Sequence, residues 1–220
     1  MIDIDNTLLD FHLSVVYSLE RVFKEFNIPF KDEYVPKFIE INDGLWRKIE
    51  NNELTREQLF EIRFNTVFKA LNIDADGVSV ETAFRRELFD SAVLVDGAKE
   101  ILQYLSSKYK VYAASNAIYD QQVNRLKKAG ILEYITDVFV SDRTGYKKPN
   151  KEFFDYCFSN MDGATKSQTV MIGDSLSADI LGAYNFNMKS IWYNIDKKPI
   201  PEDLTANYVV DDLLEIKNIL

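Results

Sequence analysis

The sequence predicts an α/β fold, in which a Rossmann-like parallel sheet is flanked by helices and carries an inserted, all-helical cap domain. From residue 97 onward, stretches with apolar residues at helical spacing alternate with short apolar runs of the strand type. Such alternation is typical of a parallel sheet with helices on both faces. Between residues 12 and 91, by contrast, only helical spacing occurs. We therefore expect an α/β core of residues 1–11 and 92–220 and a helical cap of residues 12–91.

The expected elements follow in chain order. A first strand ends at Asp3 and Asp5; only two residues precede Asp3, so we expect either an unusually short strand or a native strand that begins upstream. The cap helices are expected over 13–28, over 34–49 with a break near Gly44, after the capping box Thr55–Gln58, and over 79–93. The core helices are expected over 97–107, 118–129, 151–160 and 177–186. The strands that follow them are expected at 111–114, 138–140, 169–172 and 190–193, and a last strand at 208–210 precedes a closing helix.

Composition narrows the classes of function. The formal net charge of -9 argues against binding to a nucleic-acid polymer, which needs a basic face. No apolar run approaches the roughly 20 residues that span a bilayer, and no secretory signal is evident. Cys157 is the only cysteine and His12 the only histidine, so disulfides, histidine-based triads and multi-histidine metal sites gain no support. We expect a cytoplasmic protein in which Cys157 is a buried packing residue.

Asp3 and Asp5 are the first candidates for a reactive site. Alternate residues of a strand face the same side, so the two carboxylates would project together from the strand end. One carboxylate can attack a substrate while the other transfers a proton. The alternative is that Asp5-Asn6-Thr7 is merely a polar turn after a strand.

Polar residues also follow three later segments of the predicted core. They are Ser115 and Asn116, the pair Lys147 and Lys148 before Pro149, and Asp174 with Asp179. Ligands of open parallel sheets bind beyond the carboxyl ends of the strands. Each residue alone would also suit a helix cap or a surface charge, but their joint placement predicts one site.

The order D-x-D-x-T, Ser, Lys-Pro and G-D-x-x-x-x-D resembles the four motifs of the haloacid dehalogenase superfamily, whose members are mostly Mg²⁺-dependent phosphatases. The resemblance covers essentially the whole chain, cap included. It implies that Asp3 is a nucleophile that forms an aspartyl-phosphate, and that Asp5 protonates the leaving oxygen and then activates water. It implies phosphate binding by Thr7, Ser115, the backbone N–H of Asn116, and Lys148. Lys148 is preferred to Lys147 because the family places its lysine immediately before proline.

The same resemblance implies a Mg²⁺ site. Its ligands would be the side chains of Asp3 and Asp174 and the backbone carbonyl of Asp5. Asp179 would contact these ligands without touching the ion, or would bind the ion through a water molecule. Several carboxylates in one cleft repel each other, and a divalent cation with a lysine offsets that repulsion. Oxygen-only ligands beside a phosphate suit Mg²⁺ rather than Zn²⁺. We hypothesise that Asp5 is protonated when the leaving group departs.

Two further features bear on the substrate. Asp5 favours phosphoryl chemistry over carbon–halogen cleavage, which does not need to protonate an alkoxide. The cap segments 42–46, 51–55 and 63–64 resemble those of bacterial pyrimidine 5′-nucleotidases, which implies a nucleoside monophosphate as substrate. Trp46 could then stack on a base, and Asn42 or Arg63 could bind its carbonyls or the ribose. The alternative is that Trp46 belongs to the cap's own core and Arg63 is an exposed helix charge.

Other functions remain open. A sugar-phosphate phosphatase or a phosphoglucomutase would share every core residue named above, because selectivity lies in the cap. A protein of another class, which binds a phosphorylated ligand or regulates a partner without turnover, would also keep the fold. The sequence does not indicate an oligomeric state.

Overall fold

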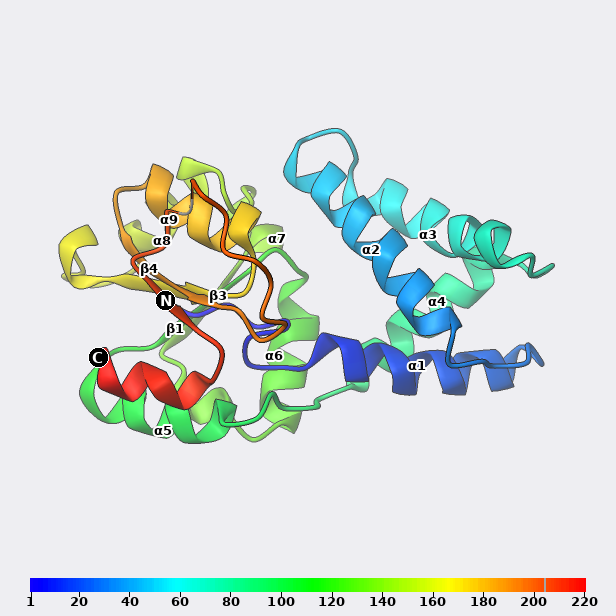
Figure 1. The fold of residues 1–220 in the computed structure, drawn as a ribbon, viewed down its shortest axis with the longest axis horizontal. Coiled ribbons are helices and arrows are strands. Elements are labelled where there is room, and N and C mark those ends of the chain that lie inside the picture. The colour runs from blue at the N-terminus through cyan, green and yellow to red at the C-terminus, as the bar shows by residue number, and fades with distance from the viewer. Residues whose placement is uncertain (204) are drawn as a thin grey trace. The chain divides into compact units, whose positions relative to one another are not determined.

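The computed structural model describes residues 1–203 and 205–220. The chain forms two compact units, one made of Met1–Asp10 and Ala92–Leu220 and the other of Phe11–Ser91. The first unit combines strands and helices, whereas the second contains helices (Figure 1). The predicted fold class, an α/β core with an inserted helical cap, is confirmed.

The strands of the α/β unit pair in parallel. β1 (Tyr112–Ser115) pairs with β2 (Asp137–Val140). β3 (Val170–Gly173) pairs with β4 (Lys189–Tyr193), which in turn pairs with β5 (Tyr208–Val210). These two groups are joined by Ile2, which forms parallel bridges to Ala113 and Ile172. The N-terminal segment therefore lies at the centre of the sheet, between β1 and β3.

The predicted first strand is reduced to this bridge. Ile2 N–H donates to the Tyr112 carbonyl at 2.8 Å, and Asp3 N–H donates to the Ile172 carbonyl at 2.8 Å. The chain then turns at Asn6, whose φ of 59° is left-handed, a conformation that asparagine tolerates better than most residues. The ladder thus ends at Asp3, beside the carboxyl ends of β1 and β3.

Helices cover both faces of the sheet, because successive residues of β1 pack against helices on opposite sides. Tyr112 and Ala114 pack into one buried cluster, which includes residues of α8 (Lys151–Ser159). Ala113, between them, packs into the opposite cluster with residues of α5 (Ala98–Lys108) and α6 (Tyr119–Lys128). Successive strand residues point to opposite faces, so both faces of β1 are buried. This burial explains why the strand reads as a continuous apolar run.

Several short elements differ from the expected ones. The helix expected over 177–186 begins as the π-helical turn Leu176–Ile180 and continues as α9 (Leu181–Asn185). The closing helix is a 3₁₀ helix over Leu213–Asn218. Short helices at Leu132–Tyr134, Lys166–Gln168 and α7 (Ser141–Thr144) were not predicted. One turn of helix is too short for a hydrophobic period to be read from sequence.

The cap contains α1 (Phe11–Glu25), α2 (Tyr34–Glu50), α3 (Arg56–Leu71) and α4 (Gly77–Asp90). Helix α3 packs against α2 and α4, and α1 packs against α4. Phenylalanines fill the centre of this unit: Phe23, Phe38, Phe64, Phe68 and Phe84. The capping box at the start of α3 is confirmed, because Thr55 Oγ1 accepts from Gln58 N–H and Gln58 Oε1 accepts from Thr55 N–H.

The break expected near Gly44 is wrong, since α2 runs through this residue without interruption. A glycine inside a helix costs only about 1 kcal/mol relative to alanine. Phe38, Leu45 and Ile49 bury the inner face of α2, and burying such side chains contributes about 1.5–3 kcal/mol each. Packing therefore outweighs the local preference at Gly44.

Candidate active site

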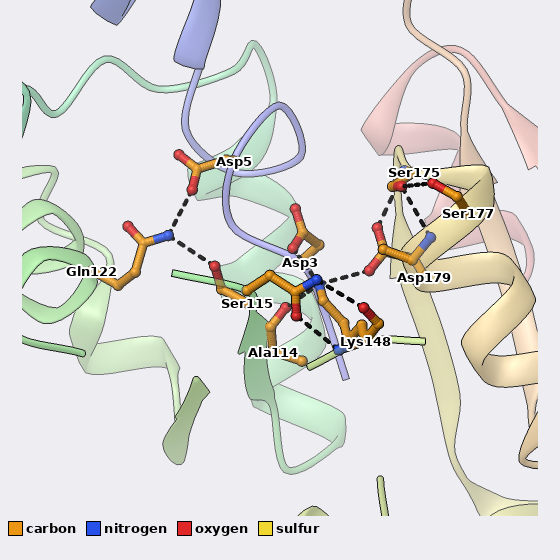
Figure 2. A network of polar contacts seen from close by, with 11 residues as sticks. Asp3, Asp5, Ala114, Ser115, Gln122, Lys148, Ser175, Ser177 and Asp179 are labelled. Atoms are coloured by element: carbon orange, nitrogen blue, oxygen red, sulfur yellow. Dashed lines mark hydrogen bonds and ion pairs between the residues drawn. The ribbon is translucent and has the colours of Figure 1, made fainter. Parts of the chain in front are cut away.

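Asp3, Lys148 and Asp179 form the buried centre of the site, although 145 residues separate Asp3 from Lys148 in the chain. The Lys148 ammonium donates to Asp3 Oδ1 at 2.6 Å, to Asp179 Oδ1 at 2.7 Å and to the Ala114 carbonyl at 2.6 Å (Figure 2). An ammonium has three donors, so all three are used. This arrangement draws together the N-terminal segment, β1, the loop before α8 and the turn after β3.

Asp174 completes a carboxylate cluster with Asp3 and Asp179. One oxygen from each of the three side chains lies within 4.8 Å of the others. Asp174 directly follows β3 and is half-buried, and its backbone carbonyl accepts a hydrogen bond from Trp192 Nε1 at 2.9 Å. The indole of the buried Trp192 thereby holds the main chain at Asp174.

The charges in this cluster perturb one another. Burial raises the pKa of Asp3 to about 7, although the Lys148 ammonium opposes the shift. Burial and the neighbouring Asp3 and Asp179 carboxylates raise the pKa of Asp174 well above its usual range. Burial opposes the charge of Lys148 as well, but Asp179 and Asp3 outweigh it and raise the pKa of that ammonium. The site thus has more acidic groups than one lysine can neutralise, and an added cation would relieve their repulsion.

Asn116, which follows β1, connects the end of this strand to the loop that contains Lys148. Its Nδ2 donates to the Lys148 carbonyl at 2.9 Å, and its Oδ1 accepts from the Lys148 N–H at 2.8 Å. The Asn116 side chain therefore holds both the N–H and the carbonyl group of Lys148. Ser115, at the end of β1, is 3 % exposed. The lysine that reaches the Asp3 carboxylate is Lys148 (Figure 2).

Asp5 and Asp3 have different hydrogen-bond partners, although the strand pattern predicts that their carboxylates project together from the strand end. The Asp5 carboxylate accepts from Gln122 Nε2 and from Arg125 Nη1, each at 2.6 Å, whereas Asp3 accepts from Lys148 (Figure 2). The rule that residues i and i+2 share a side holds only in an extended strand. The ladder ends at Asp3 and the chain turns at Asn6, so the rule does not reach Asp5.

Thr7 is completely buried in the same turn. Within residues 1–203 and 205–220, its hydroxyl has no hydrogen-bond partner. A buried hydroxyl without a partner costs free energy. Phosphate binding by Thr7 stays a prediction.

Arg63 and Asn42 lie in the interior of the cap. Arg63 Nε and Nη2 donate to the two Glu81 carboxylate oxygens at 3.0 and 2.6 Å, and Nη1 donates to Asn42 Oδ1 at 2.9 Å. The guanidinium also lies 5.0 Å from the Phe84 ring centroid. Arg63 is 2 % exposed, so it is not the exposed helix charge considered as an alternative. Trp46 is half-buried against the small apolar cluster around Leu45.

Sequence reasoning missed Gln122, Arg125, Glu81 and Trp192. Gln122 and Arg125 are three residues apart on α6, and both are completely buried. Helical spacing places them on the face that carries the buried Leu126. Polar residues on the apolar face of an amphipathic helix indicate that a buried polar partner faces them, and this pattern could have been found in the sequence.

The chain belongs to the haloacid dehalogenase-like hydrolase family, whose family model matches residues 1–193. It is 34% identical to the HAD-hydrolase YfnB of Bacillus subtilis, with 100% of this chain and 94% of that protein aligned. It is 32% identical to the pyrimidine 5′-nucleotidase PynA of Streptococcus pneumoniae and 27% identical to the pyrimidine 5′-nucleotidase YjjG of Escherichia coli, each over 95% of the relative. These alignments cover 100% and 99% of this chain.

A solved structure agrees with this assignment. The crystal structure of YfnB bound to magnesium superposes with a TM-score of 0.94 and covers 100% of this chain and 96% of that chain. Among the described residues, no helix is both long and apolar enough to cross a membrane.

Proposed function

We propose that this protein is a cytoplasmic, Mg²⁺-dependent phosphomonoesterase that hydrolyses pyrimidine nucleoside monophosphates through an aspartyl-phosphate. The observation that carries the proposal is the Lys148 ammonium, which contacts the Asp3 carboxylate at 2.6 Å beside two further acids. A buried lysine at a nucleophilic carboxylate suits an anionic phosphate, because it neutralises charge as two anions approach.

The residues present fit a magnesium ion. The cluster of Asp3, Asp174 and Asp179 offers only oxygen ligands, which is the donor set that Mg²⁺ prefers. The raised pKa values of Asp3 and Asp174 reflect a charge imbalance that a divalent cation removes. Asp3, Asp174 and the Asp5 carbonyl would hold the ion. Asp179 would not bind the ion directly but would hold the Lys148 ammonium beside it. When bound, Mg²⁺ stabilises the negative charge of the phosphoryl group.

We assign the roles of the protein groups as the resemblance to the family implies. Asp3 attacks phosphorus and forms the covalent intermediate, which divides a very slow hydrolysis into two easier steps. Asp5 gives a proton to the leaving oxygen and later takes one from the attacking water. Phosphoryl oxygens are bound by Ser115, the Asn116 N–H, the buried Thr7 hydroxyl and Lys148. Lys148 also orients Asp3, the group it already contacts.

The choice of a nucleotide rests on the relatives and on the cap. Two full-length relatives are named pyrimidine 5′-nucleotidases. Trp46 is half-buried, so part of its ring is available to stack on a base. Arg63 donates hydrogen bonds to Asn42 and to Glu81. These bonds support a role for Arg63 and Asn42 in shaping the cap around α2 and not in binding a base directly.

A phosphate-release screen tests this proposal. We expect pyrimidine nucleoside monophosphates to be hydrolysed faster than hexose phosphates, with activity lost when Mg²⁺ is chelated. A preference for hexose phosphates would favour a sugar-phosphate phosphatase instead. A requirement for added sugar bisphosphate would indicate a mutase, and no hydrolysis of any ester would indicate a binding or regulatory protein.

The Trp46→Ala variant tests the base contact separately. We expect it to lose activity on pyrimidine nucleotides while p-nitrophenyl phosphate, which has no nucleobase, is still cleaved. Unchanged selectivity in this variant would refute the stacking role without affecting the assignment as a phosphatase.

A further inference from the structure

Two side chains of α6 hold the Asp5 carboxylate at both oxygens. Arg125 Nη1 donates to Asp5 Oδ1 and Gln122 Nε2 donates to Asp5 Oδ2, each at 2.6 Å. Arg125 Nη1 also donates to Gln122 Oε1 at 3.0 Å, so the three side chains form a closed ring. The Arg125 side chain is 1% exposed and that of Asp5 is 29% exposed. The ring therefore anchors a partly exposed acid to the buried face of a helix.

Gln122 connects this ring to the end of β1. Its Nε2 donates to Ser115 Oγ at 3.0 Å as well as to Asp5 (Figure 2). One amide group thus joins the acid to the hydroxyl that faces the phosphate in the proposed function. An ion pair that only stabilised the fold would require Arg125 and Asp5. It would not require the further hydrogen bond from Gln122 to Ser115.

We propose that Gln122 and Arg125 are positioning residues, which fix the Asp5 carboxyl group beside Ser115 for proton transfer to the leaving oxygen. This inference rests on the proposed function. As Asp3 attacks, the bond between phosphorus and the leaving oxygen breaks, and the proton on Asp5 Oδ2 passes to that oxygen. Asp5 Oδ1 stays on Arg125 throughout, so the carboxyl group keeps its orientation. In the second step, Asp5 Oδ2 accepts a proton from the attacking water.

The inference predicts an effect that depends on the leaving group. An alkyl ester such as thymidine 5′-monophosphate needs a proton on its departing oxygen, whereas the p-nitrophenolate of p-nitrophenyl phosphate departs without one. General acid catalysis contributes about 100-fold to 10,000-fold. Removal of a positioning residue should therefore lower the rate with the alkyl ester selectively.

The experiment compares kcat/KM for the two esters in wild-type protein and in the Gln122→Met and Arg125→Met variants. This parameter reports the steps up to departure of the leaving group, and it excludes later hydrolysis of the intermediate. We expect a loss of about 100-fold with the alkyl ester and less than about 10-fold with the aryl ester. Arg125→Lys, which can still donate to Asp5, should recover part of the loss. Lys127→Met, an exposed change on the same helix, should alter neither value.

An Asp5→Asn background shows whether the two residues act through Asp5. There, Arg125→Met and Gln122→Met should add no further loss that depends on the leaving group. Equal losses with both esters, or no loss in folded variants, would overturn the inference. If Arg125→Met does not fold, Gln122→Met and Arg125→Lys decide the matter. Failure of the proposed function looks different, because wild-type protein would then fail to cleave thymidine 5′-monophosphate before any substitution is made.

Discussion

A β-carbon on Gly173 would lie 2.2 Å from Oδ2 of Asp179 and 2.4 Å from its Cγ. Asp179 cannot move away easily, because it is completely buried and accepts hydrogen bonds from Lys148 Nζ and from Ser175 N–H. We therefore expect Gly173→Ala to destabilise the fold by about 1–3 kcal/mol, as overpacking does, and to displace Asp179 from Lys148. Urea denaturation and the Mg²⁺ dependence of phosphate release measure the two effects.

Gly44→Ala is the matched control for this prediction. A β-carbon at Gly44 meets nothing within 4 Å, and the residue lies inside α2. Alanine should therefore stabilise the protein by up to about 1 kcal/mol and leave the Mg²⁺ dependence unchanged. A Gly173→Ala protein as stable and active as the Gly44→Ala protein would contradict the packing described here.

Neighbouring lysines should differ sharply in their effect on turnover. Lys148→Met removes the ammonium that contacts Asp3 and Asp179, so we expect kcat to fall by at least about 100-fold, as for loss of one preorganised electrostatic partner. Lys147→Met changes the adjacent, half-buried lysine and should reduce kcat by less than about 3-fold. Kinetics with p-nitrophenyl phosphate measure both. A larger loss at Lys147 would show that the wrong lysine has been assigned.

The Arg63–Glu81 pair should be important for cap stability. Both side chains are 3% exposed, so Arg63→Met leaves a buried carboxylate without its ionic partner. We expect a loss of about 3–5 kcal/mol, and the added change Glu81→Gln should recover part of it. The exposed pair of Arg86 and Glu25 is the control, since solvent screens this pair and Arg86→Met should change the stability little. Equal effects of the two arginines on urea unfolding would contradict this account.

Mg²⁺ affinity should rise with pH. Burial raises the pKa of Asp3 from its ordinary 3.8 to about 7 and raises that of Asp174 as well. The folded, metal-free site therefore holds protons that the unfolded chain releases. Its contribution to stability is fully present below about pH 4 and is lost as pH rises towards about 7. A cation binds the ionised carboxylates, so binding strengthens over the same interval and releases protons.

Calorimetric titration of Mg²⁺ at about pH 6 and about pH 8 checks this prediction. Repeating each titration in buffers of different ionisation enthalpy counts the protons released. Asp174→Asn should remove most of the binding, whereas Asp155→Asn, an exposed change on α8, should not affect it. Affinity that is constant or falls with rising pH would contradict the prediction.

The sequence predicted the fold well where periodicity could be read. Apolar runs marked the strands of the parallel sheet, and the capping box at Thr55 marked the start of α3. It failed where tertiary contacts override local preference. Gly44 did not interrupt α2, and the closing segment after β5 formed a 3₁₀ helix. Such choices depend on packing partners that are distant in the chain.

The sequence predicted which residues belong to the site better than it predicted which of them contact one another. Motif order brought attention to Asp3 and Lys148, which the structure places in contact. The partner of Asp5 was not predictable, since Arg125 lies 120 residues away and no local pattern encodes that pairing. The interior ion pair of Arg63 was missed for the same reason. Sequence spacing can place a charged residue on a helix face, but only the fold determines its partner.

The proposed mechanism requires Asp3 to carry a phosphoryl group during turnover. Acid quenching during steady-state hydrolysis of a nucleoside monophosphate, followed by peptide mass spectrometry, tests it most directly. We predict one phosphoryl group on Asp3 in the N-terminal peptide, labile to hydroxylamine as an acyl phosphate is, and absent when Asp3→Asn is used or Mg²⁺ is chelated. Full turnover by Asp3→Asn, or a phosphoryl group on another residue, would contradict the account.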